Sequence, residues 1–443
     1  MSEHHHTTTL GCCVAAPASN SGKTTIVLAL ISGLIKRGLK LQTFKCGPDY
    51  VDPSFHRTLT GKECPNIDTW LMGPEGVREI WDANMQTADV GICEGVMGLF
   101  DGKYPDSLEG SSADCAIALN LPVILVVPAQ GMAASVAAIV RGFCTHHPRV
   151  TIAGIILNYV GSSNHASILR KALAHYDLPP IVGAIPKNSD WALPSRQLGL
   201  VPASEISDYK NKLLQISEEI EKYIHFDVLL DILHSHSVNR TIHEPSPDNQ
   251  ASPRGILAVA QDEAFCFYYA NNLDYLKKLG WEIVEFSPIR DSHLPFCDAL
   301  YLGGGYPEQF IEELSSNSSM LASIRQHALL NKEIYAECGG YMYLCKQLIM
   351  PDGTQYPLSG VIDATARMGS QLKSLGYRES TLLSAPLGLP KTCYRGHEFH
   401  WSHIEHHSSY QALHQYHDRQ GNLCKDGVDT GYIRAGYIHL YWR

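Results

Sequence analysis

The sequence predicts an α/β protein made of two doubly wound domains, each with a mostly parallel sheet. Three observations predict this fold: short apolar strands alternate with helical stretches, a polar segment at residues 236–253 interrupts the alternation, and the chain has 443 residues. A chain of that length exceeds one hydrophobic core, so two or three domains are expected. Continuous apolar strands joined by helices are typical of parallel sheets that are covered on both faces.

The first series of elements occupies residues 8–235. An apolar strand at Leu10–Ala16 leads through a loop into a helix at Thr24–Arg37, which Gly38 ends. Residues Ser207–Leu233 are predicted to be helical. The remaining predicted strands are Leu39–Cys46, Val90–Glu94, Val123–Pro128, Ile152–Asn158 and Val182–Pro186, and further helices are Ala133–Cys144 and His165–His175.

A linker and a second series of elements follow. Residues 236–253 are polar and contain three prolines, which is the composition of a linker. The second domain is predicted over residues 254–443. Its predicted elements are strand Ile256–Ala260, helix Asn271–Leu279, strands Glu282–Phe286 and Ala299–Leu302, helix Glu308–Leu314, strand Glu333–Ala336, helix Tyr341–Leu348 and strand Ala435–Tyr441.

Composition excludes several classes of protein. The formal net charge of −10 argues against a nucleic-acid or membrane-surface partner. No apolar run reaches transmembrane length, and residues 1–9 lack the regions of a secretory signal. The 13 cysteines form no CxxC pair, and several lie inside apolar strands, as expected of reduced thiols. These features predict a cytoplasmic protein. We also expect a monomer or homodimer that acts on small molecules.

A phosphate-binding loop follows the first strand. The strand–loop–helix order, the Gly-Lys pair and the two hydroxyls after it are what such a loop needs. Backbone N–H groups would hold the phosphates of ATP, Lys23 would neutralise their charge, and the Thr24 hydroxyl would bind Mg²⁺. Pro17 departs from the common pattern, which has its first glycine there. The predicted ATP-binding residues are Ser19, Asn20, Ser21, Gly22, Lys23, Thr24 and Thr25.

Acidic residues follow two of the predicted strands. The carboxyl ends of parallel strands are where ligands bind in such sheets. Together with Thr24, Asp52 and Glu94 are the predicted Mg²⁺ ligands, because Mg²⁺ prefers carboxylates and phosphate oxygens. Lys45, Asp49 and Asp101 are predicted to face the phosphates or the substrate. The alternative is that these acids cap helices or form turns beside Gly and Pro.

A cysteine nucleophile is predicted at Cys338. It lies between an apolar strand and an apparent helix, in a Cys-Gly-Gly turn that would expose a thiol. His439, about 100 residues later, would act as its base. Backbone N–H groups of Gly339, Gly304 and Gly305 are candidate oxyanion donors. The alternatives are a buried structural thiol and a core histidine.

Residues 395–407 contain five histidines. A metal site is conceivable there, but on a strand His397 and His400 point to opposite faces, and no Cys or Asp spacing completes a ligand set. We prefer a polar strand near the active cleft or the domain junction.

In combination, these motifs resemble the cobyrinate a,c-diamide synthases of corrinoid (vitamin B12) biosynthesis, over nearly the whole chain. The N-terminal half is similar to the dethiobiotin-synthetase-like P-loop fold. The C-terminal half is similar to class I glutamine amidotransferases of the cobyrinate and cobyrate synthase type. The segments that carry the resemblance are 19–25, 45–53, 94–102, 196–202, 302–307, 337–341, 395–402 and 437–442.

The resemblance implies a mechanism and its substrates: cobyrinate, L-glutamine and ATP with Mg²⁺. Cys338 would attack the carboxamide of glutamine, form a thioester and release ammonia. In the N-terminal domain, ATP would phosphorylate a carboxylate of the macrocycle, and ammonia would displace the phosphate to leave an amide. Many class I domains carry a Glu two residues after the His. Tyr441 stands there, so a Cys338–His439 dyad is expected.

Two alternatives stay open. One is the same chemistry on hydrogenobyrinate, nickel sirohydrochlorin or the later cobyrate carboxylates. The other is a P-loop switch ATPase with an inert amidotransferase-like module. Such ATPases usually carry a lysine five residues before the loop lysine, where this chain has Ala18.

Overall fold

The computed structural model describes residues 6–193, 195–196, 199–200, 209–241, 252–418 and 421–443. The chain divides into two compact units, residues 1–246 and 247–443, which we treat separately. The signature at 196–202 lies largely outside the described residues. No helix in the described ranges is both long and apolar enough to cross a bilayer.

The N-terminal unit alternates strands and helices. Its strands are β1 (His6–Ala15), β2 (Leu41–Cys46), β3 (Asn66–Ile67), β4 (Val90–Glu94), β5 (Val123–Pro128), β6 (Ile152–Val160), β7 (Ile181–Pro186), β8 (Ser195–Arg196), β9 (Gly199–Leu200) and β10 (Val238–Thr241). Its α-helices are α1 (Lys23–Lys36), α2 (Asp52–Thr60), α3 (Thr69–Met85), α4 (Ser112–Leu119), α5 (Ser135–His146), α6 (Ser163–His175), α7 (Tyr209–Glu221) and α8 (Phe226–Ser235).

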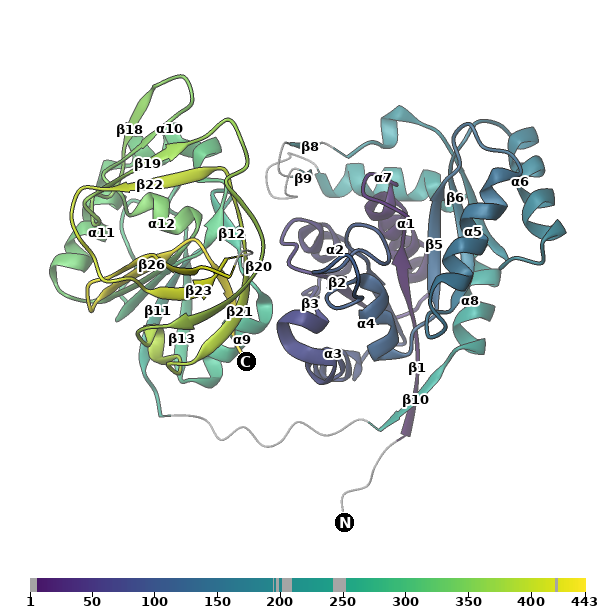
Figure 1. Cartoon of the computed structure of the whole chain (residues 1–443), viewed down its shortest axis with the longest axis horizontal. Coiled ribbons are helices and arrows are strands. Elements are labelled where there is room, and N and C mark those ends of the chain that lie inside the picture. Colours follow the sequence, from purple (N-terminus) through teal and green to yellow (C-terminus); the bar gives the residue numbers. More distant parts are fainter. Residues whose placement is uncertain (1–5, 194, 197–198, 201–208, 242–251, 419–420) are drawn as a thin grey trace, which may run out of the picture. The chain divides into compact units, whose positions relative to one another are not determined.

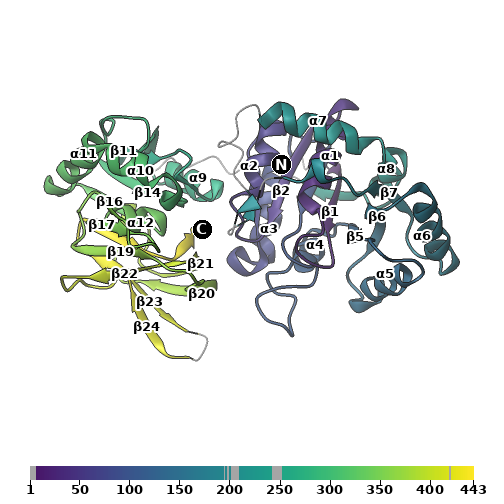
Figure 2. The same ribbon diagram turned by 90° about the horizontal axis from the view of Figure 1, so that it is seen from above.

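Seven of these strands form a parallel sheet in the order β3-β2-β4-β1-β5-β6-β7 (Figure 1). Helices α1, α7 and α8 cover one face, and α3, α4 and α5 lie on the other (Figure 2). The strands are buried on both faces, which explains their apolar sequences. The predicted fold is confirmed, and the carboxyl ends of β1, β2 and β4 meet at one edge.

Two details of this unit refine the prediction. The described part of the predicted helical stretch Ser207–Leu233 holds two helices, because α7 ends at Glu221 and α8 begins at Phe226. Ile224 between them forms an isolated bridge to Gly183 of β7, so pairing with the sheet edge breaks the helix. Within the predicted linker, β10 pairs antiparallel with β1.

The C-terminal unit is richer in strands. Its strands are β11 (Gly255–Ala260), β12 (Phe265–Phe267), β13 (Trp281–Phe286), β14 (Ala299–Leu302), β15 (Gly304–Gly305), β16 (Glu333–Glu337), β17 (Gln347–Ile349), β18 (Gln355–Pro357), β19 (Ala364–Met368), β20 (Ser374–Leu382), β21 (Cys393–His400), β22 (Ser402–His406), β23 (His414–His417), β24 (Leu423–Asp426), β25 (Val428–Asp429), β26 (Ile433–Gly436) and β27 (His439–Tyr441). Its α-helices are α9 (Ala270–Lys278), α10 (Ile311–Ser316), α11 (Ser318–Leu329) and α12 (Gly339–Tyr343).

The central sheet of this unit has the order β13-β11-β14-β16-β26-β25 and is parallel except for β25. A second sheet, β24-β23-β20-β21-β27, is antiparallel. The predicted strand Ala435–Tyr441 is therefore wrong as one element: its first part belongs to β26 and its last to β27, in different sheets. That crossing brings the end of the chain from beside β16 to β21.

Two predicted helices are also shorter or broken. The segment Tyr341–Leu348 contains only the end of α12, which stops at Tyr343, before β17 begins. The segment Glu308–Leu314 consists of a 3-10 turn, Pro307–Phe310, followed by α10. In both cases the chain turns back toward a packed core after a few residues, and tertiary contacts override the local helical pattern.

Candidate active site

The loop after β1 has the geometry of a phosphate site. Gly22 adopts a φ of 80° at the start of α1, and no side chain caps the first N–H groups of that helix. A Cβ on Gly22 would lie 2.3 Å from Nδ2 of Asn158, so glycine is required. The Lys23 ammonium donates to the backbone oxygen of Met97 at 2.6 Å. Uncapped N–H groups beside a lysine are suited to bind an anion.

Asn158 was not among the predicted site residues. It lies near the end of β6, and its amide donates to the backbone oxygen of Ser21 at 2.9 Å. This hydrogen bond holds the loop against the sheet. No sequence signal points to Asn158, because a lone Asn inside a strand has no motif around it.

Acidic side chains and a lysine gather at the ends of β2 and β4. Lys45 and Glu94 are register partners and are buried. The Lys45 ammonium lies 3.1 Å from Oε1 of Glu94 and also donates to Oδ2 of Asp52. Burial opposes the charge on Lys45, but Asp52, Glu94 and Asp49 together raise its pKa well above the ordinary value. The lysine therefore stays charged.

The three predicted metal ligands converge on one point. The Thr24 hydroxyl donates to Oε1 of Glu94 at 2.7 Å and lies 3.3 Å from Oδ2 of Asp52. A hydroxyl and two carboxylates are the oxygen donors that Mg²⁺ prefers, so this set fits a magnesium ion in kind. Because the same carboxylates hold the ammonium of Lys45, a bound ion would share them with that lysine.

His56 is a second residue that the sequence analysis missed. Its ring is fully buried, with Nε2 2.6 Å from Oε2 of Glu94 and Nδ1 3.4 Å from the sulfur of Cys64. Burial opposes protonation, but Cys64 and Glu94 raise the pKa of His56 to about 10. His56 therefore donates to Glu94. One signal was present: His56 stands four residues after Asp52, and so on the same face of a helix that begins there.

Asp49 and Asp101 partly act as turn formers, which was the alternative to a role in binding. Oδ1 of Asp49 accepts from the backbone N–H groups of Val51 and Asp52, as a turn former does, while Oδ2 lies 3.5 Å from the Lys45 ammonium. Asp101 is exposed and accepts from the N–H of Gly98 at 2.9 Å. A substrate role for either residue stays a prediction.

Cys338 lies at a strained elbow between β16 and α12. Its φ of 50° and ψ of −103° are a conformation that non-glycine residues rarely adopt. Its N–H donates to the oxygen of Gly436, and the N–H of Gly340 donates to the oxygen of Gly303. These bonds fix the elbow against β26 and the turn after β14. Burial, and then the charge of Glu308, raise the pKa of the thiol.

The predicted oxyanion turn lies beside the elbow and the histidine. A Cβ on Gly304 would lie 2.4 Å from Cε1 of His439, and a Cβ on Gly339 would lie 3.3 Å from the nitrogen of Gly305. These close approaches require glycine at both turns. The structure thus brings the Cys338 elbow, the glycine turn and His439 into one neighbourhood.

The environment of His439 keeps its ring neutral. The side chain is fully buried and stacks on His397, with ring centroids 4.9 Å apart. Burial, and then the neighbouring His397 and His400, lower the pKa of His439 well below the usual range. A neutral imidazole can accept a proton from a thiol.

Glu337 is a third missed residue. Its buried carboxylate accepts from the hydroxyls of Tyr335 and Tyr301 and from the N–H of Leu440 at 3.2 Å. It therefore links the residue before Cys338 to the residue after His439. Burial raises the pKa of Glu337 to about 7. In the sequence, Glu337 stands out only as the first residue of the Glu-Cys-Gly-Gly-Tyr motif.

Within the described residues, no three histidines of residues 395–407, alone or with Cys, Asp or Glu side chains, lie close enough together to share one metal ion. Among the described residues, the one group of three or more His, Cys, Asp or Glu side chains placed to share a metal ion is Cys13, Cys46 and Cys93. These three thiols are fully buried in the N-terminal sheet.

Two family models match the chain. Residues 12–201 match the CobQ/CobB/MinD/ParA nucleotide binding domain, and residues 256–443 match the CobB/CobQ-like glutamine amidotransferase domain. The phosphate loop lies in the first match and the Cys338 elbow in the second.

Relatives match along nearly the whole chain. A cobyrinate a,c-diamide synthase of Leptospira interrogans is 40% identical over 97% of this chain and 94% of its own length. Proteins of the same name from Syntrophotalea carbinolica and Picrophilus torridus are each 38% identical over 97% of this chain, and over 95% and 94% of their own lengths. The chain therefore belongs to the cobyrinate a,c-diamide synthase family.

Proposed function

We propose that this chain is an ATP-dependent, glutamine-hydrolysing ligase that converts the a and c carboxylates of cobyrinate into amides during cobalamin biosynthesis. One observation carries the proposal: a single chain holds both an uncapped phosphate loop and a cysteine elbow beside a buried neutral histidine. We assign the ligase half to residues 8–235, the linker to 236–253 and the glutaminase half to 254–443.

In the glutaminase half, Cys338 passes its proton to His439 as its sulfur attacks the carboxamide carbon of glutamine. The backbone N–H groups of Gly304, Gly305 and Gly339 stabilise the oxyanion. The C–N bond breaks, His439 returns the proton to the leaving nitrogen, and ammonia departs. Water then hydrolyses the thioester to glutamate. Because burial keeps both thiol and imidazole neutral at rest, proton transfer awaits the substrate.

In the ligase half, the loop at 19–25 binds the phosphates of ATP and Lys23 neutralises their charge. A carboxylate oxygen of the macrocycle attacks the γ-phosphorus, and the bond to ADP breaks. Ammonia then attacks the acyl carbon, and inorganic phosphate leaves. Thr24, Asp52 and Glu94 would hold Mg²⁺, which neutralises phosphate charge when bound. Lys45 is the nearest cation to that set and would face the transferred phosphoryl group.

Cys338→Ser tests the division of labour. Amide formation from glutamine should be lost, whereas amide formation from an ammonium salt should persist, because ammonia bypasses the thiol. Cys345→Ser is the matched control, since Cys345 is an equally buried thiol a few residues away. Loss of ammonia-dependent synthesis in Cys338→Ser alone would refute the assignment.

Lys23→Ala and Glu94→Gln test the ligase half. Both variants should lose amide formation with either nitrogen source. Lys23 would neutralise the charge of the ATP phosphates, and Glu94 would hold the Mg²⁺ that neutralises the same charge. Near-normal rates in the variants would show that ATP does not act at this loop.

The preferred macrocycle is a separate question. Product masses from cobyrinate and from hydrogenobyrinate, measured side by side, identify it.

A further inference from the structure

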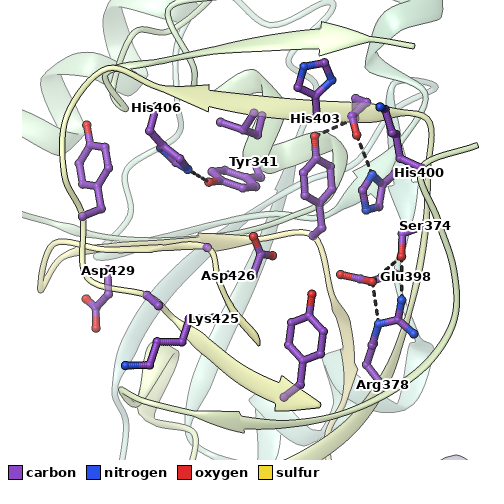
Figure 3. A pocket seen from close by; sticks show the side chains of 18 of the residues that line it. Tyr341, Ser374, Arg378, Glu398, His400, His403, His406, Lys425, Asp426 and Asp429 are labelled. Atoms are coloured by element: carbon purple, nitrogen blue, oxygen red, sulfur yellow. Dashed lines mark hydrogen bonds and ion pairs between the residues drawn. The ribbon is translucent and has the colours of Figure 1, made fainter. Parts of the chain in front are cut away.

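Two groups of possible metal ligands take no part in the chemistry described above. In the C-terminal unit, three histidines of residues 395–407 line a cavity of about 950 Å³, but their rings are spread along its wall (Figure 3). In the N-terminal unit, the thiols of Cys13, Cys46 and Cys93 converge, and their sulfur atoms all lie within 4.8 Å of one another. This second group, the thiol cluster, has the arrangement of a metal site.

The thiol cluster joins three neighbouring strands of the sheet. Cys13 of β1 and Cys93 of β4 are register partners, so their side chains point to the same face. Cys46 ends β2 on the other side of β4, and its sulfur lies 3.2 Å from that of Cys93. On the helical side, the sulfur of Cys13 lies 4.0 Å from the backbone oxygen of Ser112, at the start of α4. All three thiols are fully buried between the sheet and this helix.

A fourth thiol helps to place one negative charge in the cluster. Hydrogen bonds from Cys115 of α4, and then from Cys13 and Cys93, lower the pKa of Cys46 well below the ordinary value. Hydrogen bonds within the cluster raise the pKa of Cys13 and of Cys93 well above it. The charge therefore rests on Cys46. A buried thiolate is costly, and a cation bound to its sulfur would stabilise it.

We propose that the thiol cluster binds one Cu(I) ion through its three sulfur atoms. Ligand sets made only of sulfur select soft metals. Metal–thiolate bonds are about 2.3 Å long, which places the sulfurs of a three-coordinate ion about 4 Å apart. The separation of 3.2 Å between Cys46 and Cys93 would open by about 1 Å or less, and no pair lies beyond 4.8 Å.

The number of ligands separates Cu(I) from Zn²⁺. Zn²⁺ prefers four ligands, whereas in the part of the chain that the structure describes the group has three members. Cu(I) is stable with three sulfur ligands and needs no water molecule to complete its shell. Binding involves no change of oxidation state: the ion enters as Cu(I), and each thiol that becomes a thiolate releases one proton to solvent.

A bound ion would link the strands that carry the phosphate site. Cys13 stands before the phosphate loop, Cys46 follows Lys45, and Cys93 precedes Glu94. The ion would therefore fix the ends of β1, β2 and β4 relative to one another. Because the cluster is fully buried, the ion enters while the N-terminal unit folds and is then shielded from chelators.

Chelator-resistant copper in the full chain tests the proposal. The chain is produced in cells supplied with copper, and bathocuproine disulfonate then strips copper from exposed thiols. We expect about one resistant copper ion per wild-type chain and none in Cys93→Ala. Cys12→Ala is the matched control and should keep the ion, because Cys12 is equally buried but points to the opposite face of β1. No resistant copper in wild type, zinc in its place, or equal copper in Cys93→Ala would overturn the proposal.

X-ray absorption at the copper edge gives a second readout that needs only the wild-type chain. Three sulfur ligands at about 2.3 Å are expected, and a shell with nitrogen, oxygen or only two sulfurs would overturn the proposal. Folding of Cys93→Ala is checked by the thermal shift that ADP with Mg²⁺ produces. A normal shift shows that loss of copper reports the missing ligand, and the absorption spectrum decides if the variant does not fold.

Discussion

Two buried glutamates, Glu94 and Glu337, show how surroundings set different protonation states for the same side chain. Glu94 meets the ammonium of Lys45 and the ring of His56, which outweigh its burial and hold its pKa below the usual range. Glu337 meets only neutral hydroxyls and one N–H, so burial raises its pKa to about 7. Glu94 thus remains a carboxylate beside the phosphate loop, whereas Glu337 is a protonatable link under the thiol elbow.

His56→Ala should weaken the ligase half. Removing the charged donor to Oε2 of Glu94 should lower the free energy of unfolding by about 2 kcal/mol or more and raise the KM for ATP in the ammonium assay. Denaturant unfolding and ATP titration measure both. His175→Ala, at an exposed helical histidine, should change stability by less than about 0.5 kcal/mol. Equal effects of the two substitutions would argue against the pairing with Glu94.

Glu337 should make stability depend on pH. Its folded pKa of about 7 exceeds the ordinary value of 4.5 for a glutamate, so between these values the folded chain keeps a proton that the unfolded chain has released. The free energy of unfolding therefore falls as pH rises from 4.5 to 7. Glu337→Gln should lack this contribution, so wild type should lose stability relative to the variant across that interval. A pH-independent difference between the two unfolding curves would contradict the raised pKa.

The turn between β14 and β15 should be intolerant of any side chain. Gly304→Ala places a methyl group 2.4 Å from Cε1 of His439, well inside contact distance, so the ring or the turn must shift by about 1 Å. Glutamine-dependent synthesis should fall about 100-fold, with the ammonia-dependent rate retained. In the control Gly142→Ala, on helix α5, the added Cβ meets no heavy atom within 4 Å. An unchanged rate of glutamine-dependent synthesis in Gly304→Ala would show that the position of His439 does not matter for the reaction.

Local sequence patterns predict where strands lie better than they predict which sheet each strand joins. Apolar runs such as Val123–Pro128 and Ala299–Leu302 coincide with β5 and β14, because burial on both faces leaves a continuous signal. The split of Ala435–Tyr441 into β26 and β27 had no such signal. Gly436 and Tyr437 read as strand residues, and only pairing with distant β16 and β21 separates the two pieces.

The two units should respond separately to nucleotide. ADP with Mg²⁺ at about 100 times its dissociation constant should stabilise the N-terminal unit by about 2.7 kcal/mol and leave the transition of the C-terminal unit in place. Removal of Mg²⁺ by a chelator should reduce the shift, and Lys23→Ala should abolish it. Calorimetry of the full chain resolves this. A shift that survives in Lys23→Ala would locate the nucleotide elsewhere.

For the whole molecule, sequence motifs revealed the residues proposed to act in each site and missed most of the residues that hydrogen-bond to them. Lys23 and Cys338 were predictable because each stands in a strand–turn–helix sequence with its own chemistry, and Glu94 because it ends a predicted strand beside the phosphate loop. Asn158 was not, because it acts through Ser21, far away in the chain. The spacing of His56 from Asp52 and the place of Glu337 beside Cys338 were visible, but neither revealed the distant partners, Glu94 and Leu440. Long-range pairs of that kind leave no spacing in a single sequence.

The central claim is that ATP activates a carboxylate of the macrocycle before ammonia arrives. Cobyrinate labelled with ¹⁸O in its carboxylates tests it, with the isotope content of the inorganic phosphate measured by mass spectrometry. Acyl-phosphate formation predicts one ¹⁸O atom in the phosphate for each amide formed. Phosphate free of ¹⁸O, with normal amide formation, would contradict it.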